Sequence, residues 1–292
     1  MPLQKVSAAD ARPLVNAMSV DVEDYYQVWA LSNVIRKTDW PSWESRVGAS
    51  TNLILDLFAE TGATATFFTL GCVAQDNPSL VRRIVEEGHE LASHGYWHDK
   101  VSALQPKSFF ADVSDAKKRL EDIGGVRVLG YRAPSFSIGD NQTWAYQELA
   151  EAGYTYSSSL HPIVHDHYGR PDAPRFPYRE AAGISEIPVA TVNLFGRRWS
   201  CAGGGYFRLL PYSLYSKPLL RRLNEGEGKP AAFYFHPWEV DGGQPRVSGL
   251  SVRSRLRHYT NLDAMYGKLS RLLREFEWGR FDRVYPMFTS AA

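Results

Sequence analysis

Cysteine is scarce in this sequence, because its 292 residues include only Cys72 and Cys201. Two cysteines this far apart form neither a disulfide framework nor a Cys-x-x-Cys metal-binding motif. The first ten residues lack the apolar core of a signal peptide, and no later stretch is long and apolar enough to span a bilayer. These absences predict two reduced thiols and a cytoplasmic protein, with peripheral attachment to a membrane as the alternative.

An excess of charge of either sign is also absent. The 33 Lys and Arg residues balance 32 Asp and Glu residues, which leaves a formal net charge of +1. This balance argues against bulk attraction to nucleic acid or to an anionic membrane. The sequence has no internal repeat and no low-complexity tract. With 44% hydrophobic residues, its length fits one large α/β domain or two small ones.

The pattern that is present alternates strands with helices. Runs of β-branched and aromatic residues predict strands at 16–21, 65–70, 90–93, 126–132, 154–159, 184–190 and 231–236. Helical periodicity with start and stop signals predicts helices at 51–60, 78–87, 108–123, 141–152 and 261–276. Repeated βα units of this kind indicate a parallel sheet, either open or closed into a barrel.

Four polar residues fall at the carboxyl ends of predicted strands, namely Asp21, His94, Arg132 and His236. Catalytic residues gather at this end of the strands in parallel α/β folds and barrels. Buried polar groups without partners are costly, whereas the same groups are useful in a cleft at the strand ends. The sequence therefore predicts an active site at this edge of the sheet.

Two histidines four residues apart, His94 and His98, indicate a metal site. Imidazole is the commonest side-chain ligand of zinc, and a catalytic site with open positions needs one carboxylate more. The string Ser-Val-Asp21-Val-Glu23-Asp24 supplies it. On a strand Asp21 and Glu23 point the same way, and a turn after Asp21 would let Asp24 face the site as well. A solvated loop with a helix-capping Asp is the alternative interpretation.

Arg132, Ser135 and His236 complete the set of candidate catalytic residues. A fixed guanidinium at Arg132 can pair with a catalytic carboxylate. Pro134 stiffens the turn that follows, so the backbone N–H of Ser135 can be held towards an oxyanion. His236 ends an apolar strand and precedes Pro-Trp, which favours a general acid over a histidine of the core.

The order of these motifs over residues 16–240 resembles the polysaccharide deacetylases of carbohydrate esterase family four. The strings around them, including Asp-Val-Glu-Asp-Tyr-Tyr, Tyr-Arg-Ala-Pro-Ser-Phe and Phe-His-Pro-Trp-Glu, resemble the subgroup encoded with exopolysaccharide and exosortase (PEP-CTERM) loci. The resemblance implies a distorted (β/α) barrel of seven or eight strands with a C-terminal extension. It also implies a divalent metal, usually zinc, and removal of N-acetyl groups from amino sugars.

The resemblance also implies a role for each matching residue. Asp21 matches the base, Arg132 the arginine that holds the base, and His236 the general acid. The backbone of Ser135 would stabilise the oxyanion. His94 and His98 match the imidazole ligands, and the carboxylate ligand is either Glu23 or Asp24. The stretch at 156–159, where the family often has an Asp that orients the acid, contains none.

The expected organisation is an N-terminal segment at 1–15, a catalytic barrel at 16–240 and a helical extension at 241–292 that packs on the barrel. The expected partner is an N-acetylated oligo- or polysaccharide, free or attached to a lipid or nucleotide carrier, with peripheral association with an exopolysaccharide synthesis complex. Alternatives are an O-acetyl esterase, another C–N hydrolase like the allantoinase relatives, and a non-catalytic sugar-binding barrel. The basic stretch Arg246, Arg253, Arg255 and Arg257 is either a solvated face or a contact for a sugar diphosphate.

Overall fold

The computed structural model describes residues 14–165 and 169–290. A nine-stranded sheet forms the centre of the molecule. The strands are β1 (Val15–Val22), β2 (Thr66–Thr69), β3 (Glu90–Ser93), β4 (Gly130–Tyr131), β5 (Tyr156–Ser157), β6 (Tyr178–Arg179), β7 (Ser185–Glu186), β10 (Ala232–Phe235) and β11 (Glu277–Gly279). Their order is β10-β1-β2-β3-β4-β5-β7-β6, with β11 beside β1. All neighbours are parallel except β6 and β7.

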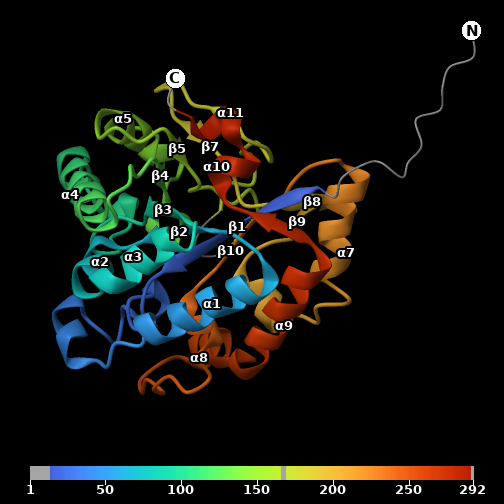
Figure 1. The fold of residues 1–292 in the computed structure, drawn as a ribbon, viewed down its shortest axis with the longest axis horizontal. Coiled ribbons are helices and arrows are strands. Elements are labelled where there is room, and N and C mark those ends of the chain that lie inside the picture. Colours follow the sequence, from blue (N-terminus) through green and yellow to red (C-terminus); the bar gives the residue numbers. More distant parts are fainter. Residues whose placement is uncertain (1–13, 166–168, 291–292) are drawn as a thin grey trace, which may run out of the picture.

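Helices cover the outside of this sheet (Figure 1). They are α1 (Val47–Thr61), α2 (Gly71–Asp76), α3 (Pro78–Glu86), α4 (Pro106–Gly124), α5 (Ala145–Glu151), α6 (Gly204–Leu209), α7 (Ser216–Arg221), α8 (Val252–Tyr259), α9 (Leu262–Glu275), α10 (Phe281–Val284) and α11 (Pro286–Thr289). Within the described residues, the end strands β10 and β6 are not hydrogen bonded to each other. The sheet is therefore a curled, open barrel, which confirms the expected distorted (β/α) barrel.

Strand β1 lies in the middle of the core. Seven of its eight residues are buried, as expected for a parallel strand that is covered on both faces. Its apolar side chains Met18, Val20 and Val22 belong to the largest hydrophobic cluster. The helix stops also follow the sequence: Gly62 ends α1 and Gly125 ends α4, both with a left-handed backbone, which glycine adopts without steric cost.

Three predicted strands are shorter in the structure than in the sequence analysis. The segments predicted at 126–132, 154–159 and 184–190 are reduced to β4, β5 and β7, of two residues each. The chain leaves the sheet after Tyr131 to enter a 3-10 turn. Pro188 lacks an N–H donor, so β7 ends before it. The hairpin of β8 (Thr191–Leu194) and β9 (Arg197–Ser200), and strand β11, were not predicted.

The carboxyl-end rule holds for all four polar residues. Asp21 is the penultimate residue of β1, and His94, Arg132 and His236 directly follow β3, β4 and β10. These strands lie side by side in the order β10-β1-β2-β3-β4. A single edge of the sheet therefore carries all the residues that the sequence analysis singled out as catalytic. Across residues 14–165 and 169–290, no helix has the length and apolar character of a membrane span.

Candidate active site

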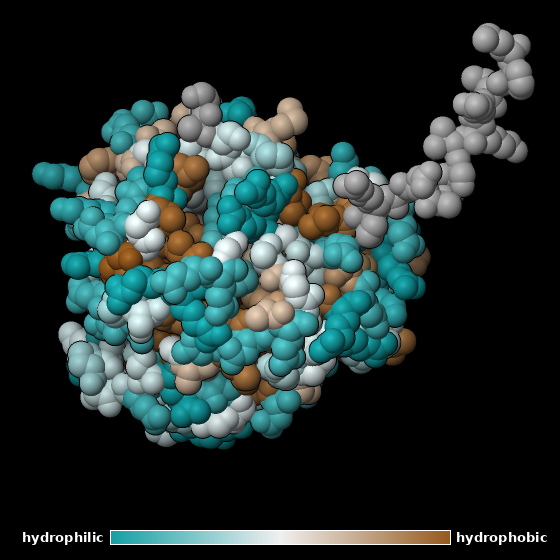
Figure 2. All heavy atoms as spheres, in the orientation of Figure 1, coloured by the Kyte–Doolittle hydropathy of each residue, from teal (hydrophilic) through white to brown (hydrophobic). Residues whose placement is uncertain are grey.

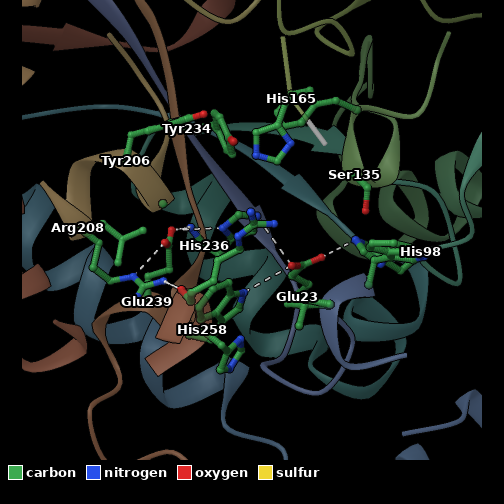
Figure 3. A pocket seen from close by; sticks show the side chains of 18 residues that line it. Glu23, His98, Ser135, His165, Tyr206, Arg208, Tyr234, His236, Glu239 and His258 are labelled. Carbon is green, nitrogen blue, oxygen red and sulfur yellow. Dashed lines mark hydrogen bonds and ion pairs between the residues drawn. The ribbon is translucent and has the colours of Figure 1, made fainter. Parts of the chain in front are cut away.

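Three side chains that can bind a metal ion meet at the carboxyl ends of β1 and β3. Glu23 follows β1, and His94 and His98 follow β3. Glu23 Oε2 lies 2.5 Å from His98 Nε2 and 3.8 Å from His94 Nε2. One ligand atom from each residue lies within 4.8 Å of the other two. The histidine pair therefore meets a carboxylate, and Figure 3 shows Glu23 and His98 facing each other.

The donor set of this cluster fits a divalent metal. The side chains are buried, with exposed fractions of 3% for Glu23, 2% for His94 and 6% for His98. No hydrogen-bond donor of the described residues is well aligned with Glu23 Oε2. A buried carboxylate oxygen in that position is costly unless a cation compensates it. Two imidazoles and one carboxylate are a common set of protein ligands in catalytic zinc sites.

His94 is held in the state that a metal ligand needs. Burial lowers the pKa of His94 to about 4, so its ring is neutral near pH 7. Its Nδ1 lies 2.9 Å from the carbonyl oxygen of Arg132. Because a carbonyl only accepts, the ring proton sits on Nδ1 and the lone pair on Nε2. A backbone acceptor behind the imidazole is the usual way to orient a ligating histidine.

Glu23 is held as a carboxylate in the same cluster. Burial by itself raises the pKa of Glu23, but the nearby charges of His98 and His236 outweigh burial and lower the pKa to about 2. The indole Nε1 of Trp238 donates a hydrogen bond of 3.4 Å to Glu23 Oε1. One carboxylate oxygen is thus fixed by Trp238, while the other faces the histidines.

Asp24, the other carboxylate that the sequence left open, points away from the histidines. Its Oδ2 accepts hydrogen bonds from Ser45 Oγ at 2.8 Å, from the Arg46 N–H at 2.9 Å and from the Val47 N–H at 3.2 Å. Val47 begins α1, so Asp24 satisfies backbone donors at the start of that helix. The structure therefore places Asp24 outside the cluster and brings Glu23 to the histidines, as strand alternation favours.

The carboxylate of Asp21 lies beside this cluster in contact with Arg132. Asp21 Oδ1 accepts a hydrogen bond from Arg132 Nη1 at 2.5 Å. Both residues are buried, with Arg132 at 0% and Asp21 at 2% exposure. The other oxygen, Asp21 Oδ2, lies 3.9 Å from His236 Nε2. The structure thus brings the predicted base, its arginine and the predicted acid together.

The Arg132 guanidinium is fixed by partners on every side. Ser19 Oγ accepts from Nη1 at 2.8 Å, Ser158 Oγ from Nη2 at 2.9 Å, and the Ser158 carbonyl from Nε at 3.0 Å. The ring centroid of Phe68 lies 4.0 Å from its Cζ. A planar guanidinium presents donors in a rigid fork, so these contacts leave one orientation. Ser158, in the stretch 156–159 that contains no Asp, supports Arg132 instead.

Glu239 orients His236. Glu239 Oε2 lies 3.1 Å from His236 Nδ1 and accepts the His236 backbone N–H at 3.1 Å. Glu239 Oε1 pairs with Arg208 Nε at 3.3 Å, and both side chains are 1% exposed. A Cβ added at Gly204 would overlap the Glu239 carboxylate. The result is a buried chain from Arg208 through Glu239 to His236, which Figure 3 shows along one wall of the pocket.

This environment keeps His236 protonated. Burial alone would lower the pKa of His236. The hydrogen bond to Glu239 and the charges of Glu23, Glu239 and Asp21 outweigh burial and raise the pKa to about 9. With Nδ1 directed to Glu239, Nε2 faces the cluster, 3.7 Å from Glu23 Oε1. His236 can therefore carry a proton on Nε2 at the point where the base and the cluster meet.

Trp238 links the acid to the region after residue 240. Its ring stacks on His236, with centroids 5.2 Å apart, and on His258, with centroids 4.5 Å apart and planes at 12°. His258 donates through Nε2 to Gln244 Oε1 at 2.7 Å. Burial and the nearby Arg208 charge lower the pKa of His258 to about 3, so His258 stacks as a neutral ring. Helix α8 thereby helps to hold the active-site edge.

A cavity of about 270 Å³ opens beside these groups. Its lining includes Glu23, His98, Ser135, His236, Glu239 and Arg208, together with the aromatic residues Trp29, Phe136, Tyr206, Tyr234 and Trp238. Ser135 and His98 both have a left-handed backbone, with φ of 54° and 58°. Non-glycine residues rarely adopt this conformation, and such strain concentrates at functional sites.

Sequence reasoning did not identify the residues that hold His236 in place, namely Glu239, Arg208 and His258. The spacing of His236 and Glu239 was a usable signal, because residues three apart after a strand end can meet when the chain enters a 3-10 turn. No comparable signal marked Arg208 or His258. They lie on α6 and α8, and only the packing of those helices against the turn brings them to Glu239 and Trp238.

Two adjoining regions of the chain match family models of known proteins. Residues 39–157 match the family model "Polysaccharide deacetylase", and residues 158–286 match "Domain of unknown function (DUF3473)". A chitooligosaccharide deacetylase of Sinorhizobium fredii is 39% identical over 67 residues, which cover 23% of this chain and 31% of that protein. A peptidoglycan-N-acetylglucosamine deacetylase of Bacillus cereus is 35% identical over 101 residues, which cover 35% and 46%. The chain thus spans less than half the length of these two relatives.

The fold has a match over nearly the whole chain. A crystal structure of a candidate polysaccharide deacetylase from Mycobacterium smegmatis superposes with a TM-score of 0.61 at 19% identity, covering 99% of this chain and 94% of that one. Its sequence is too distant to carry more than the fold. Together with the two family models, which adjoin at residues 157 and 158, it accounts for the chain from β1 to α11. Residues 39–157 therefore resemble the polysaccharide deacetylase family, and residues 158–286 resemble the DUF3473 domain.

Proposed function

We propose that this chain is a metal-dependent hydrolase that removes N-acetyl groups from amino sugars of a bacterial exopolysaccharide or its precursor. The observation that carries the proposal is the convergence of three units on one edge of the sheet: the Glu23, His94 and His98 cluster, the Asp21–Arg132 pair and the His236–Glu239 pair. Hydrolysis of an amide needs a base for water, stabilisation of an oxyanion and an acid for the leaving amine. Each unit fits one of these tasks.

Asp21 acts as the base. It takes a proton from the water that attacks the acetamide carbonyl carbon. Arg132 holds Asp21 Oδ1 at 2.5 Å, which keeps the carboxylate oriented and leaves Oδ2 to accept the proton. Arg132 remains protonated throughout because a guanidinium does not lose its proton in proteins. A positioned base of this kind contributes roughly two to four decades in rate.

His236 acts as the acid. Its Nε2 gives a proton to the amine nitrogen as the carbon–nitrogen bond breaks, so acetate and a free amino sugar leave. Glu239 stabilises the protonated ring through Nδ1 at 3.1 Å. Burial alone would raise the pKa of Glu239, but the hydrogen bond and charge of His236, together with the charge of Arg208, lower it, so Glu239 stays ionised. His236 Nε2, the proton donor, and Asp21 Oδ2, the proton acceptor, lie 3.9 Å apart. Both atoms can therefore reach the same acetamide group.

His94, His98 and Glu23 would hold the metal, which the family implies and their donor atoms fit. When bound, a divalent ion such as Zn²⁺ supplies Lewis acidity for the carbonyl and lowers the pKa of water. In this chain, His94 keeps its lone pair on Nε2 through the Arg132 carbonyl. Ser135, whose left-handed backbone lines the cavity, would add its N–H to the oxyanion, as expected from the sequence.

The cavity supports a sugar substrate. Rings of Trp29, Phe136, Tyr206 and Tyr234 line it beside the polar edge, and a pyranose offers an apolar face to such rings and hydroxyls to the polar groups. The resemblance to the exopolysaccharide and exosortase subgroup supports an exopolysaccharide or a carrier-linked precursor over other acetylated glycans. A cytoplasmic location beside an exopolysaccharide synthesis complex would fit an intracellular precursor.

The experiment that tests the proposal measures acetate release from N-acetylated and O-acetylated oligosaccharides, with and without a chelator. We expect release from the N-acetylated substrate, loss of release with the chelator, and recovery when Zn²⁺ is added back. Release from O-acetylated substrate alone would replace the proposal with an esterase. Release that persists in the chelator at zero bound metal would overturn the metal-dependent mechanism. Absence of release from every substrate by metal-loaded protein would favour a sugar-binding barrel.

A further inference from the structure

The segment that contains α8 is strongly basic, although the chain as a whole is nearly neutral. The residues between Asp241 and Asp263 include no Asp, Glu or Lys, and they contain the arginines Arg246, Arg253, Arg255 and Arg257. The formal net charge of the whole chain is only +1. The positive charge is therefore concentrated locally, and bulk electrostatics do not describe this region.

Helix α8 presents an apolar strip to solvent between basic side chains. Val252 is 75% exposed and Leu256 is 61% exposed, and their four-residue spacing puts them on the same face of the helix. Arg253 and Arg255 are exposed on either side of this strip. His258, on the opposite face, is buried against Trp238, and Tyr259, which lies in line with the strip at the end of the helix, is buried in the cluster that includes Trp238 and Val247. An apolar strip with flanking arginines is the pattern of a helix that lies in a membrane interface.

Arg246 extends the basic surface beyond the helix. Its guanidinium lies over the ring of Tyr259, with the Cζ atom 4.4 Å from the centroid. The next residue, Val247, donates its N–H to the Tyr259 hydroxyl at 2.8 Å. The loop before α8 is thereby fixed against the end of the helix, so Arg246 and the arginines of α8 belong to one rigid surface.

The same surface adjoins the catalytic cavity. Arg257 and His258 of α8 line the cavity, as do the partly exposed apolar residues Trp29 and Leu209. The turn that holds Trp29 packs against α8. Figure 1 shows α8 and the loop before it at the lower margin of the molecule, and Figure 3 shows His258 below His236. The face seen in Figure 2 is mostly hydrophilic, with hydrophobic residues scattered between polar ones.

We propose that α8, with Arg246, binds the surface of an anionic phospholipid bilayer and holds the cavity against the headgroups. The charge of the segment is complementary to such a surface, and the exposed Val252 and Leu256 side chains would enter the interface. An acidic polysaccharide would use the same arginines. It offers nothing that favours two exposed aliphatic side chains, because sugars pack on aromatic rings.

This inference goes beyond the proposed function, since vesicle binding requires no chemistry at the active site. It also gives the proposed function a consequence. A saccharide attached to a lipid carrier would meet the cavity at the bilayer surface without leaving it. That consequence rests on the deacetylase proposal, whereas the binding of α8 to lipid does not.

The test is co-sedimentation of the full chain with vesicles of phosphatidylcholine and phosphatidylglycerol, against vesicles of phosphatidylcholine alone. We expect binding to the anionic vesicles that weakens as salt rises. Each arginine near an anionic surface strengthens binding about fivefold. The double variant Arg246→Gln with Arg255→Gln should therefore bind about 25-fold more weakly. Val252→Ser with Leu256→Ser should weaken binding about tenfold or more through lost apolar burial.

The matched control is Arg82→Gln with Arg127→Gln, which removes the same charge from exposed positions on α3 and after α4. It should bind vesicles as the natural chain does. All these variants should release acetate from a soluble substrate at the natural rate, because none of the substituted residues lines the cavity. Three results would overturn the proposal: no binding to anionic vesicles, equal weakening in the control, or loss with the arginine pair but not with Val252→Ser and Leu256→Ser. The last result would indicate a general polyanion surface.

Discussion

The proposed base, Asp21, and the proposed acid, His236, are both held in place by buried residues that include an arginine. The two arginines come from different parts of the chain. On the base side Arg132 holds the carboxylate of the proposed base directly, with Arg132 Nη1 at 2.5 Å from Asp21 Oδ1. On the acid side Arg208 holds Glu239, and Glu239 in turn holds His236. Both arginines are buried and each forms an ion pair with a carboxylate. The acid side contains one intermediate residue more.

This difference follows from what each side must present. A base must be a bare carboxylate, so one arginine suffices to orient it. An acid must be a protonated imidazole, and burial disfavours that charge. Glu239 supplies the compensating negative charge, and Arg208 forms an ion pair with Glu239 in turn. Arg132 lies within the segment 39–157 that matches the deacetylase family model, whereas Arg208, His236 and Glu239 lie within the DUF3473 match. The segment that matches DUF3473 therefore supplies the acid side of the proposed catalytic site.

The largest effect should come from breaking the base side. Arg132→Met leaves Asp21 buried without its partner, and breaking a buried ion pair from one side costs about 3–5 kcal/mol of unfolding free energy. We expect a strongly destabilised protein that releases no acetate. Urea unfolding and the acetate assay measure the two effects. The conservative variant Arg132→Lys keeps the charge but loses the fork, so it should recover stability more than activity. Full activity in Arg132→Met would contradict the role of this pair.

Removal of the charge on the acid side should have a smaller effect on activity. Glu239→Gln keeps the size of the side chain and removes the charge that stabilises protonated His236. We expect kcat to fall about 10²-fold with little change in KM, because proton donation is impaired while substrate binding is not. Steady-state kinetics on an N-acetylated oligosaccharide separate the two constants. If KM rose and kcat stayed the same, Glu239 would serve substrate binding instead.

The two sides should also differ in pH dependence. The pKa of His236 is raised to about 9 from 6.5, so its protonation stabilises the folded, metal-free protein fully below pH 6.5. That contribution is lost as pH rises through 9, by up to about 3 kcal/mol. Urea unfolding of chelated protein between pH 6.5 and 9.5 should show the decline. His236→Asn should flatten it, and an unchanged slope in that variant would refute the assignment.

The smallest effect distinguishes the two adjacent carboxylates. Asp24→Asn should leave metal content unchanged and lower stability by about 1 kcal/mol, because Asp24 serves the start of α1. Glu23→Gln, the matched variant one residue earlier, should reduce bound metal strongly. Metal analysis of the purified variants and their unfolding curves give both quantities. Metal loss in Asp24→Asn with retention in Glu23→Gln would reverse the two roles.

The sequence was sufficient to predict the polar residues at the carboxyl edge of the sheet. It was not sufficient to predict the residues that hold them in place. The positions of Asp21, His94, Arg132 and His236 were predictable because each lies at or directly after the carboxyl end of a strand, and parallel strands bring their carboxyl ends together. Strand alternation favoured Glu23 but did not settle the choice between Glu23 and Asp24, because that choice depends on where the chain turns towards α1. Arg208 and His258 were not predictable either. Their helices reach the site through tertiary packing, which leaves no periodic pattern in the sequence.

The most direct test of the central claim is acetate release by Asp21→Asn at matched metal content. The account assigns proton removal to Asp21 and metal binding to Glu23, His94 and His98. The variant should therefore bind as much Zn²⁺ as the natural chain and lose acetate release from an N-acetylated oligosaccharide by about 10²–10⁴-fold. Release at the natural rate by fully metal-loaded Asp21→Asn would contradict the account.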